Sequence, residues 1–456
     1  MKMTLRPEQR EAVERMAAEP TRAVLLASHV GTGKTLLTVE TSRTLGAKTI
    51  LVIAPLNTQD GWKKTFAVQD TEHEFRKIDA KTPENFGLLK SGVPGVYFVG
   101  REFFALSASS TPDTDDKPGR KARWSWSQVK PDVAVFDEVQ SASNRKSVTF
   151  KVLKTLKPGY KIAASATPQG NKFENLWSIS TWLWPETTDR SFWRWVAEWG
   201  TTEFNPHSAT KQTITGERVP GAYVKTLPCY IRLEAEGTPE VKRKCYIDLT
   251  TEQRVMYDEM ERDALTWLEE NPLVADIPIV KRIRLRQIGL GEVTFNSKGE
   301  VDFEIGCRSG KIDALHKIVA LHPDEPMLIL LDSAKFVKVI VDALGPGAVP
   351  WTGDTKASDR ARYKAEFGKS VKYIVATIPA IGEGTDGLQL TCHIEVWFNK
   401  STNNMKNEQA AGRLNRGGQP SEVIYSYELL ARKTDDDGQF EKLKAQTIAN
   451  RKTLTI

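Results

Sequence analysis

Apolar and polar positions alternate along residues 5–185 in a rhythm that is typical of parallel α/β sheets. Short apolar runs end in polar or glycine-bearing loops, and amphipathic segments separate one run from the next. The runs are AVLLAS, TILVIAP, GVYFVG, VAVFDE and KIAASAT. Continuous apolar runs indicate strands covered on both faces, and the segments between them indicate crossover helices. The pattern predicts a first α/β lobe over residues 1–185.

The same rhythm returns in the last third of the chain. The later runs are MLILLDS at 327–333, KYIVATI at 372–378, HIEVWFN at 393–399 and EVIYSYEL at 422–429. They predict a second lobe of the same α/β class over residues 306–456. A chain of 456 residues also exceeds a single hydrophobic core, since domains average roughly 150 residues.

Residues 186–305 differ in texture, because a loop-like stretch precedes helical segments there. We expect a linker with helical protrusions. Residues 107–128, rich in Pro, Asp and Ser, interrupt the first lobe and predict an exposed loop or hairpin. The tryptophan-rich segment at 180–199 fits either base stacking or core packing. Its helical spacing and admixed apolar residues favour the core.

Composition and charge narrow the class of protein only slightly. Hydrophobic residues at 40% and charged residues at 27% are ordinary for a globular chain, and the net charge of +6 is a mild bias toward a polyanionic partner. Four scattered cysteines lack metal-ligand spacing. No apolar run approaches the roughly 18 residues of a membrane span. We therefore expect a cytoplasmic protein without a membrane partner.

The strongest local signal is a glycine-rich turn between an apolar strand and a helix. It reads Gly31-Thr32-Gly33-Lys34-Thr35, and Ser28 stands where the common pattern has glycine. Glycines let backbone N–H groups face phosphates, Lys34 would reach the β and γ phosphates, and the Thr35 hydroxyl would bind Mg²⁺. The pattern predicts an ATP-binding phosphate loop.

An acidic pair ends the strand in VAVFDEVQ. Asp137 and Glu138 would lie at the carboxyl edge of the sheet, where open α/β sheets bind ligands. Adjacent carboxylates there can divide two tasks. Asp137 would hold Mg²⁺, and Glu138 would orient or deprotonate the attacking water.

Phosphoryl transfer needs more cations than Lys34 alone supplies. The segment NEQAAGRLNRGGQ offers Gln409, Arg413 and Arg416, and the two arginines are spaced to share one helical face. We expect them to act as arginine fingers. A solvated basic helix is the alternative for an isolated RxxR pattern.

Together these residues resemble the superfamily 2 helicases, and within them the Swi/Snf-like branch of DNA translocases. LRPEQ resembles the adenine-sensing motif, with Gln9 as its reader. ILVIAPLNTQDGWKKTF resembles the motif after the phosphate loop, and DEVQ resembles the DExH box with Gln140 in place of histidine. The resemblance implies two RecA-like lobes with parallel sheets, joined by a linker with helical protrusions, and an ATP site completed when the lobes close.

Further motifs follow in the family's order. ASATPQGNKFENLWSISTWLWPE resembles the coupling motif, which implies that Ser165 and Thr167, with Gln140, couple ATP hydrolysis to movement. VATIPAIGEGTDGLQLT resembles a second-lobe motif whose Gly384 and Asp386 would contact nucleotide. Asn399 departs from the family, because many relatives carry an Asp in that strand.

The resemblance implies an ATP-dependent motor that uses Mg²⁺ and acts on nucleic acid, with duplex DNA favoured over single-stranded DNA or RNA. By analogy, Arg101, Ser333 and Thr377 would contact the phosphate backbone. The basic run KRIRLRQ, residues 281–287, is a further candidate, but a half-buried helix in a protrusion explains it equally well.

Two other functions remain open. One is an RNA helicase of the same superfamily, and the other is an ATP-switched clamp that binds nucleic acid without moving along it. The compact chain suits a phage or bacterial protein, which would place it in the host or bacterial cytoplasm. We expect a monomer, and the sequence names no accessory protein.

Overall fold

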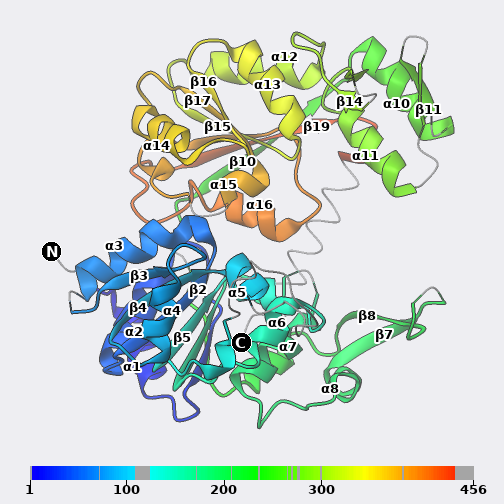
Figure 1. Cartoon of the computed structure of the whole chain (residues 1–456). Helices are drawn as coiled ribbons and strands as arrows, with labels where there is room; N and C mark the ends of the chain where they lie inside the picture. Colours follow the sequence, from blue (N-terminus) through cyan, green and yellow to red (C-terminus); the bar gives the residue numbers. More distant parts are fainter. Residues whose placement is uncertain are drawn as a thin grey trace, which may run out of the picture. The chain divides into compact units, whose positions relative to one another are not determined.

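The chain folds as two compact units, unit 1 within Met1–Ala235 and unit 2 within Glu236–Thr447 (Figure 1). The computed structural model describes residues 3–70, 72–107, 124–170, 172–206, 208–234, 237–263, 265–268, 271–274, 278–297, 300–382 and 385–436. Most of the loop predicted at 107–128 lies outside these residues. The region predicted as a linker is shared, because residues up to 234 fold with unit 1 and later ones with unit 2.

Unit 1 is built on a seven-stranded sheet in which every neighbouring pair of strands is parallel. The strand order is β3-β4-β2-β5-β6-β1-β9. The strands are β1 (Ala23–Leu26), β2 (Thr49–Ala54), β3 (Phe75–Ile78), β4 (Gly95–Gly100), β5 (Val133–Asp137), β6 (Tyr160–Ala164) and β9 (Tyr230–Ile231). The five predicted apolar runs form β1, β2, β4, β5 and β6, which confirms the first α/β lobe.

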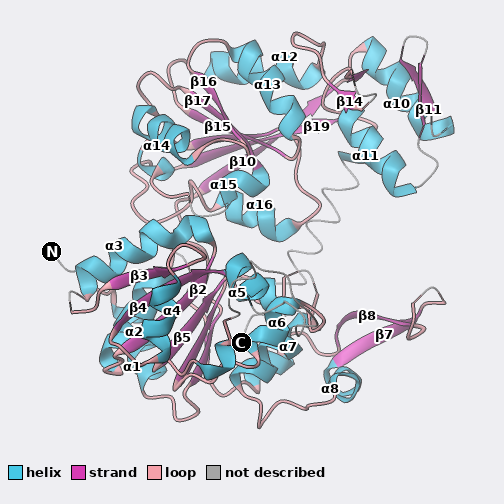
Figure 2. Cartoon of the chain, in the orientation of Figure 1, coloured by secondary structure: helices cyan, strands magenta, loops and turns pink. Residues whose placement is uncertain are grey.

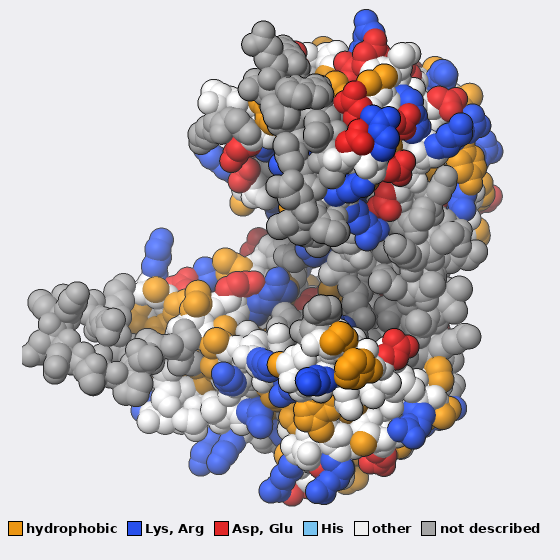
Figure 3. Space-filling view, turned by 90° about the vertical axis from the view of Figure 1, so that its right-hand side faces the viewer, with side chains coloured by type: hydrophobic (Ala, Val, Ile, Leu, Met, Phe, Trp, Pro, Cys, Tyr) orange, Lys and Arg blue, Asp and Glu red, His pale blue; other side chains and the backbone are white. Residues whose placement is uncertain are grey.

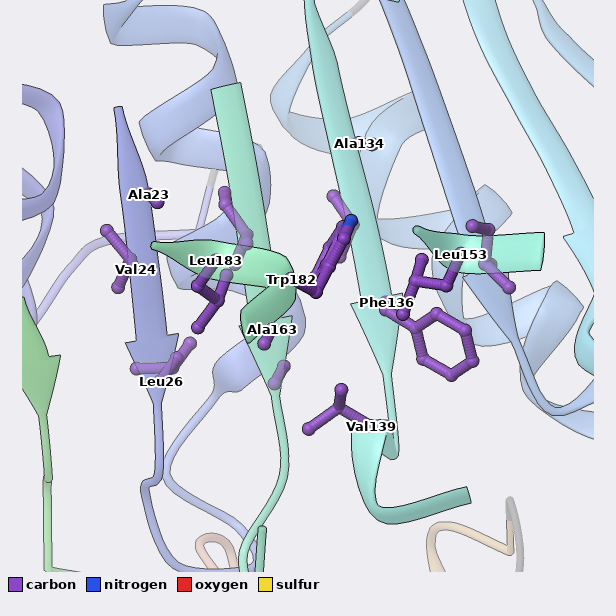
Figure 4. Packing of buried hydrophobic residues seen from close by; sticks show 14 of the residues in the cluster. Ala23, Val24, Leu26, Ala134, Phe136, Val139, Leu153, Ala163, Trp182 and Leu183 are labelled. Carbon is purple, nitrogen blue, oxygen red and sulfur yellow. The ribbon is translucent and has the colours of Figure 1, made fainter. Parts of the chain in front are cut away.

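Helices cover this sheet, as a buried parallel sheet requires (Figure 2). The helices of unit 1 are α1 (Pro7–Ala17), α2 (Lys34–Thr44), α3 (Gln59–Gln69), α4 (Pro83–Lys90), α5 (Arg101–Ser107), α6 (Val148–Leu153), α7 (Asn175–Leu183), α8 (Phe192–Trp199) and α9 (Ala222–Lys225), of which α8 lies away from the sheet. Figure 4 shows Trp182 and Leu183 of α7 beside Ala163 of β6 and Ala134 of β5. Because residues of β1, β2 and β5 are almost fully inaccessible, the sheet forms the core of unit 1.

The tryptophan-rich segment forms α7, α8 and the turn between them. Trp177, Trp182, Trp184 and Trp195 are buried, which confirms the preference for core packing. Trp193 differs, since it remains 37% exposed. After α8 an antiparallel hairpin, β7 (Gly200–Phe204) and β8 (Gln212–Glu217), extends from unit 1 (Figure 1).

Unit 2 contains a six-stranded sheet, also parallel throughout, in the order β10-β19-β18-β15-β17-β16. The strands are β10 (Glu240–Ile247), β15 (Met327–Leu331), β16 (Ala348–Trp351), β17 (Tyr373–Thr377), β18 (Ile394–Trp397) and β19 (Ile424–Ala431). The four predicted later runs form β15, β17, β18 and β19. The chain therefore has the predicted pair of RecA-like α/β lobes.

The helices and short strands of unit 2 complete its layers. The helices are α10 (Thr251–Asp263), α11 (Pro278–Ile288), α12 (Gly310–Leu321), α13 (Ala334–Leu344), α14 (Ala357–Glu366), α15 (Ile378–Gly382) and α16 (Asn404–Ala411). Two small ribbons pair β11 (Leu265–Leu268) with β12 (Asn271–Val274), and β13 (Thr294–Phe295) with β14 (Val301–Asp302). Of the helices that the structure describes, none has the length and apolar character needed to cross a membrane.

Candidate nucleotide site

The predicted phosphate loop connects the carboxyl end of β1 to the start of α2. Gly31 and Gly33 have φ values of 83° and 82°, a left-handed conformation that glycine adopts without a steric penalty. Gly33 is also the residue before α2, so Lys34 and Thr35 form the first turn of that helix. A helix N-terminus that follows such a loop presents backbone N–H groups to an anion.

The Lys34 ammonium group lies over the loop itself. Its Nζ donates hydrogen bonds of 2.9 Å to the carbonyl oxygens of Ser28 and His29. The two carbonyl oxygens hold the Lys34 ammonium group at the place where phosphates bind in a loop of this type. When a nucleotide binds, Lys34 can exchange these hydrogen bonds for bonds to phosphate oxygens.

Ser28, the departure from the common pattern, has a structural explanation. Its side chain is fully buried, and its Oγ accepts a 2.9 Å hydrogen bond from the backbone N–H of Leu233. The His29 N–H in turn donates to the Leu233 carbonyl at 3.0 Å. A glycine could not accept the first bond, so Ser28 fastens the segment after β9 to the phosphate loop.

Gln9 reaches the same loop from α1. Its Nε2 donates to the Thr32 carbonyl at 2.8 Å, and its Oε1 accepts from the Arg6 N–H at 3.0 Å. The amide is buried, and it lies so near Gly33 that a Cβ there would approach Nε2 to 2.8 Å. Gln9 thus supports the loop, while its role as adenine reader stays a prediction.

Asp137 and Glu138 occupy the end of β5, two strands from β1 in the same sheet. The Asp137 carboxylate accepts a hydrogen bond from Trp62 Nε1 at 3.3 Å and another from the Glu138 N–H at 3.0 Å. Glu138 has a φ of 52°, a left-handed conformation that costs about 1–2 kcal/mol for a residue with a Cβ. This turn directs the chain out of the sheet immediately after the strand.

The electrostatics at Asp137 indicate a site suited to a cation. Burial and the neighbouring charge of Glu138 raise the pKa of Asp137 to about 6, although the charge of Lys34 opposes the rise. A cation between Asp137 and a bound phosphate would offset both causes and keep the carboxylate ionised. Trp62 was not among the predicted site residues. The sequence could have indicated it, because it is the tryptophan of the family-like motif ILVIAPLNTQDGWKKTF.

Of the three predicted coupling residues, Gln140 contacts the acidic pair directly. Its Nε2 donates to Glu138 Oε2 at 2.7 Å, while Gln140 Oε1 is buried without a hydrogen-bond partner in the described part of the chain. Ser165 and Thr167 follow β6, the strand between β5 and β1, and the Thr167 N–H donates to Ser165 Oγ at 3.0 Å. These two residues therefore follow the strand between those that lead to the acidic pair and to the phosphate loop.

In unit 2 the predicted second-lobe residues form a separate cluster at α15 and α16. Arg413, only 9% exposed, donates to the carbonyl oxygens of Thr385 at 2.5 Å and of Gln409 at 3.2 Å, and also to that of Gly382. The arginine thus fastens the loop between α15 and Asp386 to the end of α16. The prediction that Arg413 and Arg416 share one helical face is wrong, because α16 ends at Ala411 and both arginines lie in the turn that follows.

Arg416 has a different environment from Arg413. It forms an ion pair of 2.8 Å with the Asp386 carboxylate, whose side chain is 73% exposed. Burial acts to raise the pKa of Asp386, but the hydrogen bond and charge of Arg416 hold it below its ordinary value. Gly384 lies outside the described residues, and its nucleotide contact stays a prediction.

The predicted nucleic-acid residues occupy element ends. Arg101 begins α5 and pairs with Glu102 at 2.7 Å, Ser333 caps α13, and Thr377 ends β17. Asn399, the family departure, accepts a 2.9 Å hydrogen bond from the Asp332 N–H and so holds the loop after β15. These positions fit the predicted roles without testing them.

The basic run on α11 is engaged inside unit 2. Arg282 pairs with Asp435 at 2.9 Å, Arg284 donates to Gln287 at 3.0 Å, and Arg286 donates to the Lys400 carbonyl at 2.7 Å. These contacts favour the half-buried helix over a nucleic-acid surface.

A phosphate loop with an acidic pair two strands away, followed by a second parallel α/β lobe with clustered arginines, defines a two-lobed phosphate-loop protein. Residues 8–288 match the SNF2-related domain family. That match covers more than half of the 456 residues, so the chain belongs to this family.

Known proteins of several organisms are similar to the chain. An uncharacterized ATP-dependent helicase of Mycoplasma genitalium is 24% identical over 326 residues, which cover 68% of this chain and 29% of the relative. The human chromatin-remodeling ATPase INO80 is 23% identical over 257 residues, covering 52% and 15%. The ATP-dependent DNA helicase DDM1 of Arabidopsis thaliana is 26% identical over 194 residues, covering 41% and 24%. The chain thus spans less than a third of these relatives.

Among solved structures, the Sulfolobus solfataricus SWI2/SNF2 ATPase core in complex with dsDNA is similar at 21% identity. The similarity covers 100% of this chain and 94% of that chain, with a TM-score of 0.44.

Proposed function

We propose that this chain is an ATPase that couples ATP hydrolysis to movement along duplex DNA, or to its remodelling. The observation that carries the proposal is the half-buried pair Asp137 and Glu138, two strands from the phosphate loop in the same sheet, with the Lys34 charge acting on Asp137. Membership of the SNF2-related family supports it, as do relatives that are named as DNA helicases and remodelling ATPases.

Thr35 and Asp137 would hold Mg²⁺, and their oxygen atoms are the hard donors that this ion prefers. Within the described residues no three His, Cys, Asp or Glu side chains gather as a metal site. A cation here would therefore take its remaining ligands from phosphate and water, as is usual for Mg²⁺ with nucleotides. When bound, the ion would supply positive charge that neutralises the phosphates.

Glu138 is the residue that orients or deprotonates the attacking water. Its carboxylate is held by Gln140 at 2.7 Å, and the left-handed turn fixes its backbone. The oxygen of the same amide, Gln140 Oε1, has no hydrogen-bond partner among the described residues, so a group that bonds to it would move the Glu138 carboxylate as well. Gln140 is thus suited to pass a signal to the catalytic residue, together with Ser165 and Thr167.

Charge for the transition state comes from unit 2. Arg416 is the better candidate for direct contact with the γ phosphate, since its Nε holds the Gly412 carbonyl at 2.8 Å while its other strong partner, Asp386, is exposed and can be exchanged. Arg413 positions the loop that carries Asp386, because its three backbone bonds occupy the guanidinium. Gln409, on α16, lies beside them in sequence and completes the set. One chain holds both clusters, so a monomer suffices.

Two alternatives make different predictions. An RNA helicase would be stimulated more by RNA than by DNA, and an ATP-switched clamp would bind in an ATP-dependent way without moving. Arg101, Ser333 and Thr377 are our candidates for backbone contacts, which carry little sequence information. Duplex preference and a cytoplasmic location are part of the proposal.

The test is steady-state ATPase activity with duplex DNA, single-stranded DNA and RNA, each at the same nucleotide and salt concentration. We expect the largest stimulation from duplex DNA, and Glu138→Gln serves as the inactive control. Stronger stimulation by RNA would replace the proposal with the RNA helicase. Equal, unstimulated rates with all three would leave an ATPase without a nucleic-acid partner.

A further inference from the structure

A pocket of about 680 Å³ opens in unit 1 between the β7–β8 hairpin, the start of α8 and the loop after the acidic pair. Its walls come from residues 143–146, 172–175, 192–193, 208–210 and 212–216, with Ser178 behind them. The phosphate loop and Asp137 do not line it. The pocket is therefore distinct from the nucleotide site, and the family motifs assign it no ligand.

The charge of the pocket favours an anion. Arg145, Lys146 and Lys172 line it against the single acidic residue Glu174, so its formal charge is three minus one, or +2. Lys146 and Lys172 are exposed, and neither has an acidic partner within 4.0 Å among the residues described. Figure 3 shows Lys and Arg side chains among hydrophobic and uncharged ones on this side of unit 1, with fewer acidic groups.

Hydrogen-bonding groups surround these cations. The hairpin contributes the hydroxyls of Ser208, Thr210, Thr213 and Thr215. On α7, the Ser178 hydroxyl is 1% exposed and has no hydrogen-bond partner in the described chain. A buried hydroxyl without a partner is costly unless a ligand or water satisfies it. Hydroxyls and lysines together are the groups that contact nucleic-acid backbones.

Trp193 offers an aromatic surface in the same pocket. It lines the pocket at the start of α8 and is 37% exposed, whereas Trp195 on the same helix is 1% exposed. Phe192 beside it is covered by the Arg145 guanidinium, 4.2 Å from the ring centroid. An exposed indole among cations stacks on bases, and only unpaired bases offer a free face for stacking.

We propose that this pocket binds an unpaired segment of nucleic acid, with phosphates at Lys146 and Lys172 and a base on Trp193. The inference rests on the proposed function and extends it to substrate structure. A motor with a duplex track and a separate single-strand pocket acts preferentially on branched or forked DNA. A protein ligand would not require a stacking surface beside two lysines that have no acidic partner among the described residues.

The test is fluorescence anisotropy with three labelled DNAs: a thymidine oligonucleotide, a fork with unpaired arms and a blunt duplex. Trp193→Ala weakens binding of the oligonucleotide and the fork by roughly 5- to 100-fold, and leaves the blunt duplex within about 2-fold. Phe204→Ala is the matched control. Phe204 is an aromatic residue, 76% exposed, on the hairpin that forms one wall of the pocket, but it does not line the pocket.

A second variant tests the charges. Lys146→Ala/Lys172→Ala lowers the slope of log affinity for the oligonucleotide against log salt by about 1.4, because each single-strand phosphate contact contributes about 0.7. Lys130→Ala/Lys157→Ala removes the same charge from exposed positions outside the pocket and leaves the slope unchanged. Thermal melting of each variant verifies that it is folded.

Unchanged oligonucleotide binding in both pocket variants would overturn the inference. An equal loss on all three DNAs would also overturn it, because the pocket would then be a duplex contact. Failure of the proposed function is a separate result: no DNA would stimulate the wild-type ATPase, whatever the variants do in the binding assay.

Discussion

Replacing Arg413 and Arg416 in turn separates a loop-positioning arginine from one that is available for chemistry. Arg413→Ala removes two strong charge-assisted bonds, to Thr385 and Gly382, and a weaker one to Gln409. A hydrogen bond from a charged group contributes about 1.5–3 kcal/mol, and relief from burying the guanidinium offsets part of that. We expect the free energy of unfolding of unit 2 to fall by about 3 kcal/mol.

Arg416→Ala removes the ion pair with the exposed Asp386 carboxylate, a hydrogen bond of 2.8 Å to the Gly412 carbonyl and one of 3.5 Å to the Thr385 carbonyl. An ion pair with an exposed carboxylate contributes under about 1 kcal/mol, and the bond to Gly412 is local, so we expect this variant to lose less stability than Arg413→Ala. Its DNA-stimulated turnover should nevertheless fall by orders of magnitude while nucleotide affinity changes little, because the charge acts mainly in the transition state. Arg416→Lys should restore turnover only in part.

The assays are urea unfolding followed by tryptophan fluorescence, nucleotide binding, and ATPase activity with duplex DNA. Equal stability of Arg413→Ala and Arg416→Ala would refute the positioning role of Arg413. Normal turnover in a folded Arg416→Ala would refute its role at the γ phosphate.

Three more predictions concern the nucleotide site and a buried glutamate of unit 2. Lys34→Ala or Glu138→Gln should lower ATP turnover by orders of magnitude in a protein with unchanged circular dichroism, and near-normal turnover would remove the site assignment. Gly33→Ala should weaken nucleotide binding measured by equilibrium dialysis, because the added Cβ would lie 2.8 Å from Gln9 Nε2 and the backbone φ of 82° disfavours a residue with a Cβ. Gly216→Ala is the control, since a Cβ there would meet no atom within 4 Å. Burial, together with the charge of Glu240, raises the pKa of the Glu395 carboxyl from 4.5 to about 7. Between these two pH values the unfolded chain has lost the Glu395 proton while the folded chain retains it, so the free energy of unfolding falls as pH rises. Glu395→Gln should therefore raise the free energy of unfolding by about 3 kcal/mol at pH 8 and by less than about 1 at pH 5; an equal effect at both would contradict the shift.

The strands and the nucleotide site were predictable because their signals are local. A buried parallel strand is a continuous apolar run, as in β2 and β15, and the phosphate loop needs glycines at fixed spacing between a strand and a helix. Asp137 and Glu138 were placed correctly at a strand end by the same logic.

Contacts between distant segments were not predictable. The bond between Ser28 and Leu233 joins residues 205 positions apart, and no local period records it. The full extent of β10 and its place in the second sheet were not predictable, because its exposed pattern, with lysines and an arginine, lacks the apolar run of a central strand. The burial of Arg413 was missed for a related reason: an RxxR spacing suggested a helical face, but α16 ends at Ala411 and the carbonyl groups that hold Arg413 belong to another loop.

The central claim is that ATP hydrolysis moves this chain along duplex DNA, and displacement of a third strand measures it most directly. A labelled triplex-forming oligonucleotide is placed on a duplex, and its release is followed after ATP is added to the bound protein. We predict release that requires ATP, is absent with Glu138→Gln, and is delayed in proportion to the length of duplex before the triplex. ATP-dependent binding without release would identify a clamp and contradict the claim.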